Sequence, residues 1–163
     1  MGPISWLIAI PFLSALAIIA TPARRSGWIR WIAAFGTGLQ LLLTAVVPFL
    51  YWQAAAPEAA AMRSAQLTEL YLKEDVPWFK SLGISYLVGV DGISMAMVIL
   101  TSIIIFTGVM ASWNVKERSK EFFALLLILV TGVFGVFLSF DLFLFFVFYE
   151  VAVLPMYLLI GVW

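Results

Sequence analysis

Three carboxylates stand apart from the other charged residues of this sequence. Glu150 lies well inside the apolar stretch that closes the chain, Asp141 stands at the head of that stretch, and Asp91 precedes another one. The other acidic residues fall in polar or basic connecting segments. A carboxyl group held between its neutral and ionised forms can take up and release protons. These three residues are therefore the candidate site residues.

Glu150 is the ninth residue of the apolar segment Leu142–Trp163. A helix would place it roughly 12 Å from the start of that segment, near the middle of a bilayer. A charged carboxylate there costs about 2.5–3.5 kcal/mol, and such residues face protein or water and are functional candidates by default. The competing interpretation is a neutral acid that hydrogen-bonds a neighbouring helix as structural glue.

The helix face of Glu150 offers no countercharge. None of the residues expected there can neutralise a carboxylate, and no Lys or Arg lies deep within the other apolar segments. We therefore expect Glu150 to face protein and to meet a cation from outside this chain. The residues on its face, at spacings of three, four and seven, are Phe143, Phe146, Val147, Val153, Leu154 and Tyr157.

Pro155 lies one turn beyond Glu150. A proline within a helix has no N–H, so the carbonyl of Val151, next to Glu150, loses its usual partner. That carbonyl could hold a water beside the carboxyl group, or the proline could simply kink the helix, as prolines do in membranes. The sequence leaves both interpretations open.

Asp141 and Asp91 each precede a predicted helix. Aspartate is a favoured helix N-cap, because its carboxylate accepts hydrogen bonds from the first free backbone N–H groups. We predict a cap role for both. The alternative for Asp141 is a point of proton entry or exit at the membrane surface. Gly132 and Gly135, on one later segment, predict close packing between helices.

The composition indicates an integral membrane protein. Hydrophobic residues make up 64% of the chain and charged residues 11%, against about 45–50% and about 25% in soluble domains. Cys and His are both absent, which excludes disulfides, Cys/His zinc sites and haem or iron–sulfur centres held by these residues. Net charge is zero, so nothing favours nucleic acid as a partner.

Five apolar stretches are long enough to span a bilayer as helices. The predicted fold is thus all-α, an integral membrane bundle of five transmembrane helices. We divide the chain into residues 1–52 with helices one and two, 53–90 as an extramembrane loop, and 91–163 with helices three to five. The five stretches are Ile4–Ala20, Trp28–Trp52, Ile93–Trp113, Phe122–Phe140 and Leu142–Trp163.

The long loop carries its own predictions. Its portion Pro57–Asp75 is rich in helix formers and predicts a short surface helix, which Asp75, Val76 and Pro77 would end. Ile84–Val90 is consistent with a short extended piece. Six Lys and Arg residues lie in the first and third connections and three in the second and fourth. This asymmetry places the first and third connections, and Trp163, on the inner side of the membrane.

The stretches YLVGVDGIS and KEFFALLLILVTGVFGVFLSFDLFLFFVFYEVAVLPMYLLIGVW carry a recognisable pattern. Over about Ile84–Trp163 the chain resembles the antiporter-like subunit M, or subunit 4, of proton-pumping NADH:quinone oxidoreductase, respiratory complex I. The FYE followed by LPMYLLIGVW is specific to that subunit among its sisters. The earlier half matches only as two hydrophobic helices and a variable loop.

The resemblance implies a larger bundle of inverted repeats, each with a broken helix that carries a lysine. The glutamate matching Glu150 pairs with such a lysine, and quinone reduction elsewhere drives proton movement. NADH, flavin, iron–sulfur clusters and quinone are then expected on partner subunits, with no cofactor in this chain. The membrane would be the bacterial inner membrane or an equivalent energy-transducing one. Any enzyme activity belongs to the assembly, because no bond-making chemistry is visible here.

The chain stops before every lysine-bearing broken helix of that family. We expect either a fragment or a split gene, with a separate segment supplying the membrane-embedded lysine. Two other functions stay open: a subunit of a cation/proton antiporter or membrane-bound hydrogenase, and a non-pumping scaffold that anchors partners. Sodium-dependent activity would favour the first, and pumping that survives loss of the Glu150 carboxylate would favour the second.

Overall fold

The computed structural model describes residues 2–59, 71–115 and 117–163. It contains five long helices and one antiparallel pair of strands, with short 3-10 turns after β1 and α3. The predicted membrane bundle is confirmed, since all five helices are long and apolar enough to cross a bilayer. In chain order the elements are α1 (Pro3–Ala20), α2 (Ser26–Ala59), β1 (Tyr71–Phe79), β2 (Ile84–Val90), α3 (Gly92–Ala111), α4 (Ser119–Leu138) and α5 (Leu142–Val162).

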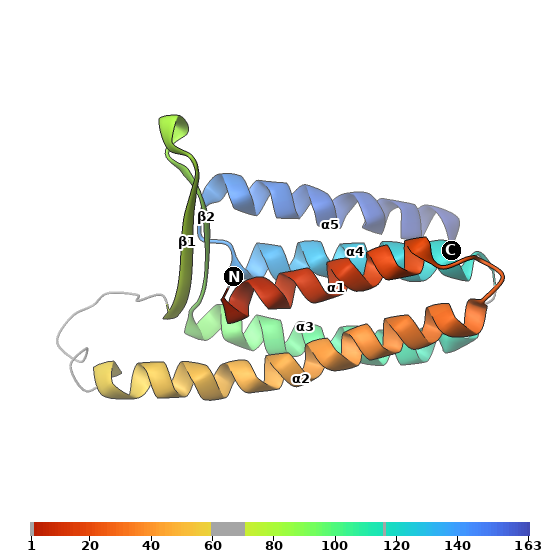
Figure 1. Cartoon of the computed structure of the whole chain (residues 1–163), viewed down its shortest axis with the longest axis horizontal. Coiled ribbons are helices and arrows are strands. Elements are labelled where there is room, and N and C mark those ends of the chain that lie inside the picture. Colours follow the sequence, from red (N-terminus) through yellow and green to blue (C-terminus); the bar gives the residue numbers. More distant parts are fainter. Residues whose placement is uncertain (1, 60–70, 116) are drawn as a thin grey trace.

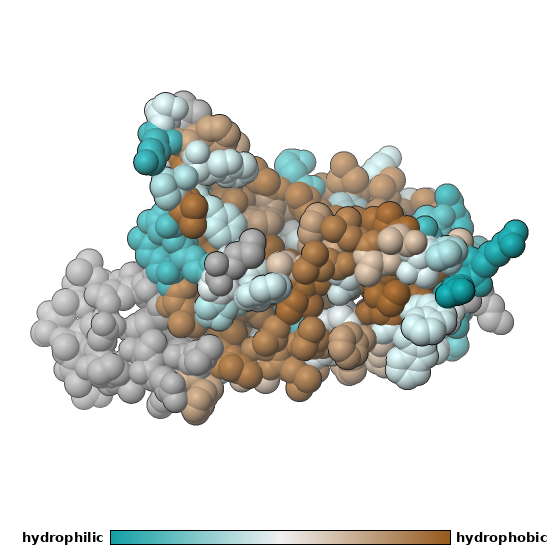
Figure 2. Space-filling model, in the orientation of Figure 1, coloured by the Kyte–Doolittle hydropathy of each residue, from teal (hydrophilic) through white to brown (hydrophobic). Residues whose placement is uncertain are grey.

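The helices run side by side, with the strand pair at one end and the α1–α2 loop and the C-terminus at the other (Figure 1). Hydrophilic side chains gather at these two ends and a broad apolar band lies between them (Figure 2). Such a band is the surface that a bilayer requires. The long axes of the helices therefore follow the membrane normal.

Helix α4 lies at the centre of the bundle and α5 at its edge. α4 packs against α5 and α1 and also touches α2 and α3. Half of the residues in its membrane-spanning window are buried, against 11% for α5. One cluster of buried apolar side chains forms near the strands, around Ile4, Val88 and Phe134. A second forms toward the other end, around Ile29 and Phe123.

Close approach of α4 and α5 depends on two glycines, as predicted. A Cβ placed on Gly132 would lie 2.6 Å from the backbone nitrogen of Ala152. A Cβ on Gly135 would overlap the ring of Phe148. The absence of side chains at these two positions lets the backbones meet, which is how small residues promote helix association in membranes.

Tyr71–Asp75, the last part of the surface helix predicted for Pro57–Asp75, is a strand in the structure. Tyr71–Asp75 belongs to β1, which pairs with β2 in the register Tyr71↔Val90 and Asp75↔Leu87. The prediction was wrong there because hairpin pairing with β2 outweighs local helix propensity. Residues 60–70 lie outside the described residues, so that part of the prediction is not assessed. The extended conformation of Ile84–Val90 is confirmed.

Two predicted boundaries also moved. β1 continues through Pro77 to Phe79, although Pro77 was expected to end the preceding element. This is tolerated because a two-stranded sheet has only edge strands, where proline need not donate a ladder hydrogen bond. Helix α2 continues past Trp52 to Ala59, while its apolar span is Gly27–Phe49.

Single-cysteine labelling will test which side of the membrane each end occupies. We expect cysteines at Arg24 and Lys120 to react from the inner side and a cysteine at Lys73 from the outer side, because of the Lys/Arg asymmetry. A membrane-impermeant thiol reagent added to right-side-out or inverted vesicles measures this. Labelling of Lys73 and Lys120 positions from the same side would contradict the arrangement.

Candidate functional site

Glu150 lies in the middle of α5 and its side chain is exposed on this chain. The opposite side of α5 packs on α4, through Phe148 and Ala152. At 100° per residue, Glu150 falls on the helix face far from these contacts. The structure therefore directs the carboxylate away from the other four helices.

The face around Glu150 is otherwise apolar. Its large side chains are exposed, and Tyr157 is 75% exposed. Across residues 2–59, 71–115 and 117–163 the ion pair found is Lys73–Asp75, on β1, so Glu150 has no cationic partner within this part of the chain. The exposed members of the face are Phe143, Phe146, Leu154 and Tyr157.

Pro155 is buried, and α5 continues past it to Val162. The proline ring thus points toward the bundle, while Glu150 points away from it. The helix does not end at this proline. Whether the nearby carbonyl of Val151 holds a water stays a prediction.

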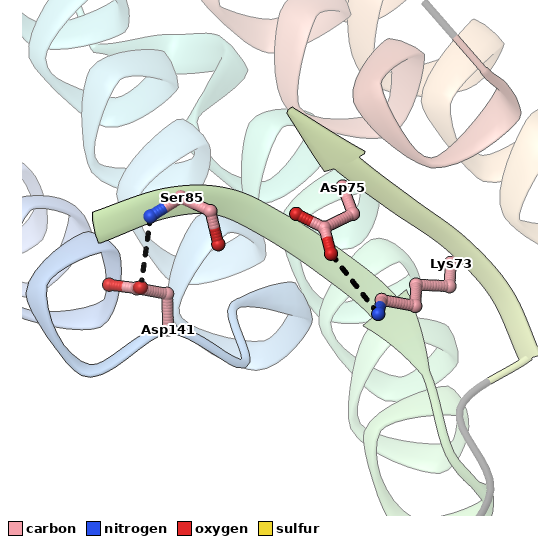
Figure 3. A network of polar contacts seen from close by, with 4 residues as sticks. All are labelled: Lys73, Asp75, Ser85 and Asp141. Atoms are coloured by element: carbon pink, nitrogen blue, oxygen red, sulfur yellow. Dashed lines mark hydrogen bonds and ion pairs between the residues drawn. The ribbon is translucent and has the colours of Figure 1, made fainter. Parts of the chain in front are cut away.

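Asp141 caps α5, as predicted. Its Oδ1 accepts hydrogen bonds from the N–H groups of Phe143 at 2.9 Å and Leu144 at 3.1 Å. Its Oδ2 accepts one from the N–H of Ser85 on β2, at 3.2 Å (Figure 3). The N–H groups of Ser85 and Leu144 lower the pKa of Asp141, and that of Phe143 adds to the effect. The carboxylate therefore both caps α5 and fastens the strand pair to it.

Asp91 caps α3 in a reciprocal arrangement. Its Oδ1 accepts from the N–H of Ser94 at 2.6 Å, while the hydroxyl of Ser94 accepts from the N–H of Asp91 at 2.8 Å. This is a capping box. Both carboxylates are thus engaged with backbone. A role of Asp141 in proton entry or exit, and any functional role of Asp91 beyond its cap, stay predictions.

Replacement of Asp91 or Asp141 by Asn should be mild. Asparagine is as good a cap as aspartate, since its side-chain oxygen can accept the same hydrogen bonds from the first N–H groups of the helix. At position 141 its NH2 group would replace the oxygen that accepts from the N–H of Ser85, so only that additional hydrogen bond is lost. We expect near-normal amounts of assembled protein and near-normal proton uptake in vesicles. A variant that assembles normally but loses proton uptake would contradict the purely structural role.

Within residues 2–59, 71–115 and 117–163, Glu74 accepts more hydrogen bonds than any other carboxylate, and sequence reasoning missed it. This residue of β1 reaches the N-terminus of α1. Its carboxylate accepts from the N–H groups of Gly2 at 2.8 Å and of Ile4 and Ser5 at 3.0 Å each, and from the Ser5 hydroxyl at 2.7 Å. Four donors on one carboxylate make it the cap of α1.

A short hydrogen-bonded chain leads away from this carboxylate. The Ser5 hydroxyl lies 3.0 Å from the hydroxyl of Tyr86 on β2. Since Ser5 gives its proton to Glu74, Tyr86 donates to Ser5. Burial raises the pKa of Tyr86, and the charge of Glu74 raises it further. Tyr86 therefore stays protonated, and this series of hydrogen bonds links α1 to both strands.

The pKa of Glu74 falls below its usual range although burial raises it. The hydrogen bond from the Ser5 hydroxyl and those from the N–H groups of Gly2, Ser5 and Ile4 together outweigh burial. The sequence around Glu74 could not indicate that it caps α1, because Glu74 is 72 residues from Gly2. The absence of any acidic residue in the first turn of α1 was the one available hint.

The Glu74 contacts should make stability depend on pH. A folded-state pKa below the unfolded value gives stability that is present above the ordinary carboxyl pKa and lost as the pH falls through the lowered one. We expect Glu74→Gln to lower the melting temperature in detergent at pH 7, with the difference from wild type shrinking toward pH 3. A constant difference across that range would contradict the ionised-cap assignment.

Gln40 of α2 supplies a hydrogen bond that is missing within α1. Pro11 cannot donate to the carbonyl of Leu7, and the fully buried Gln40 side chain donates to that carbonyl at 2.8 Å instead. The free carbonyl therefore has a partner without contact with lipid. Among the described residues no group of three or more Asp or Glu side chains is placed to hold a metal ion.

Comparison with known proteins supplies the family. Residues 39–140 match the family model described as NADH-ubiquinone oxidoreductase chain 4, amino terminus. This is more than half of the chain. The chain belongs to this family. The predicted resemblance is thereby confirmed.

Individual relatives support the same family assignment. The chain is 37% identical over 157 residues to NAD(P)H-quinone oxidoreductase chain 4 3 of a Picosynechococcus species, covering 96% of this chain and 26% of that protein. It is 37% identical over 159 residues to NADH-quinone oxidoreductase subunit M of Escherichia coli K12, covering 97% and 30%. The chain thus spans less than a third of the length of these relatives.

A solved structure has the same fold. The match is to a chain of respiratory complex I from Thermus thermophilus with bound NADH, with a TM-score of 0.69 and 20% identity. It covers 95% of this chain and 28% of that one. The arrangement of these five helices with the strand pair is therefore a known fold.

Proposed function

We propose that this chain works in a proton-translocating membrane subunit of NADH:quinone oxidoreductase, with Glu150 as its proton-linked carboxyl group. The family supports the assignment to the membrane part of that enzyme. The observation that carries the role of Glu150 is its place at mid-helix on the exposed face of α5. There it is available to a partner that this part of the chain does not contain.

The free-energy cost of a charge in the membrane favours a cationic partner beside Glu150. A lone carboxylate at mid-membrane costs about 2.5–3.5 kcal/mol or more. The cost falls if the group is protonated or if a cation lies beside it. Because α5 is the least buried helix, another protein segment can cover it. A membrane-embedded lysine on that segment would let Glu150 alternate between an ion pair and a neutral acid as the lysine loses and regains its proton.

In this proposal, other subunits carry out the redox chemistry. The sequence has no Cys or His, so the side chains that hold iron–sulfur clusters or haem are absent. NADH oxidation, flavin, iron–sulfur clusters and quinone reduction are then assigned to partners in the respiratory assembly. We place the chain in a bacterial inner membrane or an equivalent energy-transducing membrane, and its similarity to a bacterial relative supports this.

Inverted membrane vesicles with and without this chain test the proposal. NADH-driven quinone reduction and proton uptake are measured together, in the presence and absence of sodium. We expect removal of the chain to abolish the proton uptake that accompanies electron transfer, and restoration of the chain to return it. Proton uptake per electron that is unchanged without the chain would leave it a scaffold. Uptake that requires sodium would favour a cation/proton antiporter.

A further inference from the structure

A groove opens between α1 and α2 next to their connecting loop, away from Glu150. It has a volume of about 490 Å³. Leu13 and Ala17 of α1 form one wall, and Ile32 and Phe35 of α2 the other. At its base the helices are close, since a Cβ on Gly36 would overlap the Ser14 side chain. The groove is apolar and of a size that can hold much of a ligand of a few hundred ångström cubed.

The loop end of this groove is positively charged. Arg24 and Arg25 are exposed there, at the hydrophilic end of the molecule that is opposite the strands (Figures 1 and 2). Neither is ion-paired with a carboxylate within residues 2–59, 71–115 and 117–163. Helix α2 begins at Ser26 and has no acidic residue in its first turn. Its free N–H groups and the positive end of its dipole add to the field of the arginines.

Two tryptophans mark the level of the membrane surface at this groove. Trp28 and Trp31 line it and are 65% and 67% exposed. The ring of Trp31 packs edge-on against Trp113, with centroids 5.5 Å apart. Exposed indoles concentrate at the depth of lipid headgroups. The basic loop therefore lies at headgroup level and the apolar groove runs from it into the hydrocarbon.

We propose that this groove binds one anionic phospholipid of the bilayer, with its phosphate at Arg24 and Arg25 and an acyl chain between α1 and α2. A free phosphate would use the arginines and leave the apolar walls bare. A zwitterionic lipid would fill the walls but match the charge poorly. Only an amphiphile with a net negative headgroup meets both parts of the site, as with other basic pockets between transmembrane helices. This site does not depend on the role of Glu150.

Photo-crosslinking lipids in nanodiscs test the site on the intact assembly. Phosphatidylglycerol and phosphatidylcholine with the same diazirine-bearing acyl chain are compared, and adducts are mapped to the groove. We expect labelling by phosphatidylglycerol to exceed that by phosphatidylcholine by on the order of tenfold at low ionic strength, with the ratio falling in salt. In R24Q/R25Q the ratio should approach one, whereas K80Q, an exposed cation at the opposite end, should keep the wild-type ratio.

A second variant tests the apolar walls of the groove separately from the arginine charges. A17F fills the groove and should reduce adducts from both lipids. Equal labelling by the two lipids in the wild type would show ordinary surrounding lipid only and would overturn the proposal. Absence of lipid adducts in the wild-type groove would show that protein covers it, which overturns the proposal equally. If R24Q/R25Q fails to assemble, the wild-type ratio and its salt dependence decide alone.

Discussion

Glu150→Gln is expected to remove most proton uptake while the chain still assembles. Glutamine keeps the size and polarity of the side chain but can neither ionise nor form an ion pair. Because Glu150 is exposed on this chain and forms no ion pair within the described residues, the substitution removes no buried polar contact there. A large functional loss with normal assembly is therefore the expected result.

The measurement is NADH-driven proton uptake in vesicles at matched subunit content. Glu150→Asp, which keeps the charge on a shorter side chain, should retain more uptake than the Gln variant. Tyr157→Phe is a matched control, since it alters a polar group on the same exposed face without removing a charge. Full pumping by the Gln variant would end the proton-linked assignment and leave structural glue as the role of Glu150.

Gly132→Ala is expected to displace α5. The added methyl group would lie 2.6 Å from the nitrogen and 2.8 Å from the Cα of Ala152. Since both atoms belong to backbone, no rotamer change relieves the overlap and α5 must move. Overpacking of this kind costs about 1–3 kcal/mol. We expect a clear loss of assembled protein and a lower melting temperature.

Gly161→Ala provides the matched comparison on α5 itself. A Cβ at Gly161 meets nothing within 4 Å, and alanine is the better helix former. Thermal unfolding in detergent, followed together with assembly in membranes, should separate the two variants. If they behave alike, close approach of α4 and α5 is not what Gly132 provides.

Hydropathy and capping patterns predicted much of this architecture. Apolar runs of sufficient length place four of the five helices within three residues at each end, because a bilayer forces backbone polar groups to pair locally. Helix α2 alone runs further, to Ala59. Asp91 and Asp141 were predictable as caps because each lies within three residues of the N–H groups from which it accepts hydrogen bonds. Local chemistry decided these features.

Contacts with other elements decided the features that were missed. Tyr71–Asp75 becomes a strand only because β2 lies beside it. Glu74 and Gln40 serve carbonyl or N–H groups on α1, far away in the chain. The orientation of Glu150 was also hidden, because α5 is apolar on all sides and its periodicity does not distinguish the face that packs on α4. Only the glycines of α4 marked that contact.

The contact between Glu74 and α1 also has a consequence for biosynthesis. When α1 leaves the ribosome, Glu74 has not been made, and the N–H groups of Gly2, Ile4 and Ser5 have only water as a partner. Glu74 and Gly2 lie on the same side of the membrane once α1 and α2 have both crossed it, since an even number of crossings returns the chain to the side of Gly2. A chain in which only α1 has crossed the membrane would hold Glu74 on the opposite side from Gly2, so the cap of an inserted α1 cannot form until α2 has crossed as well.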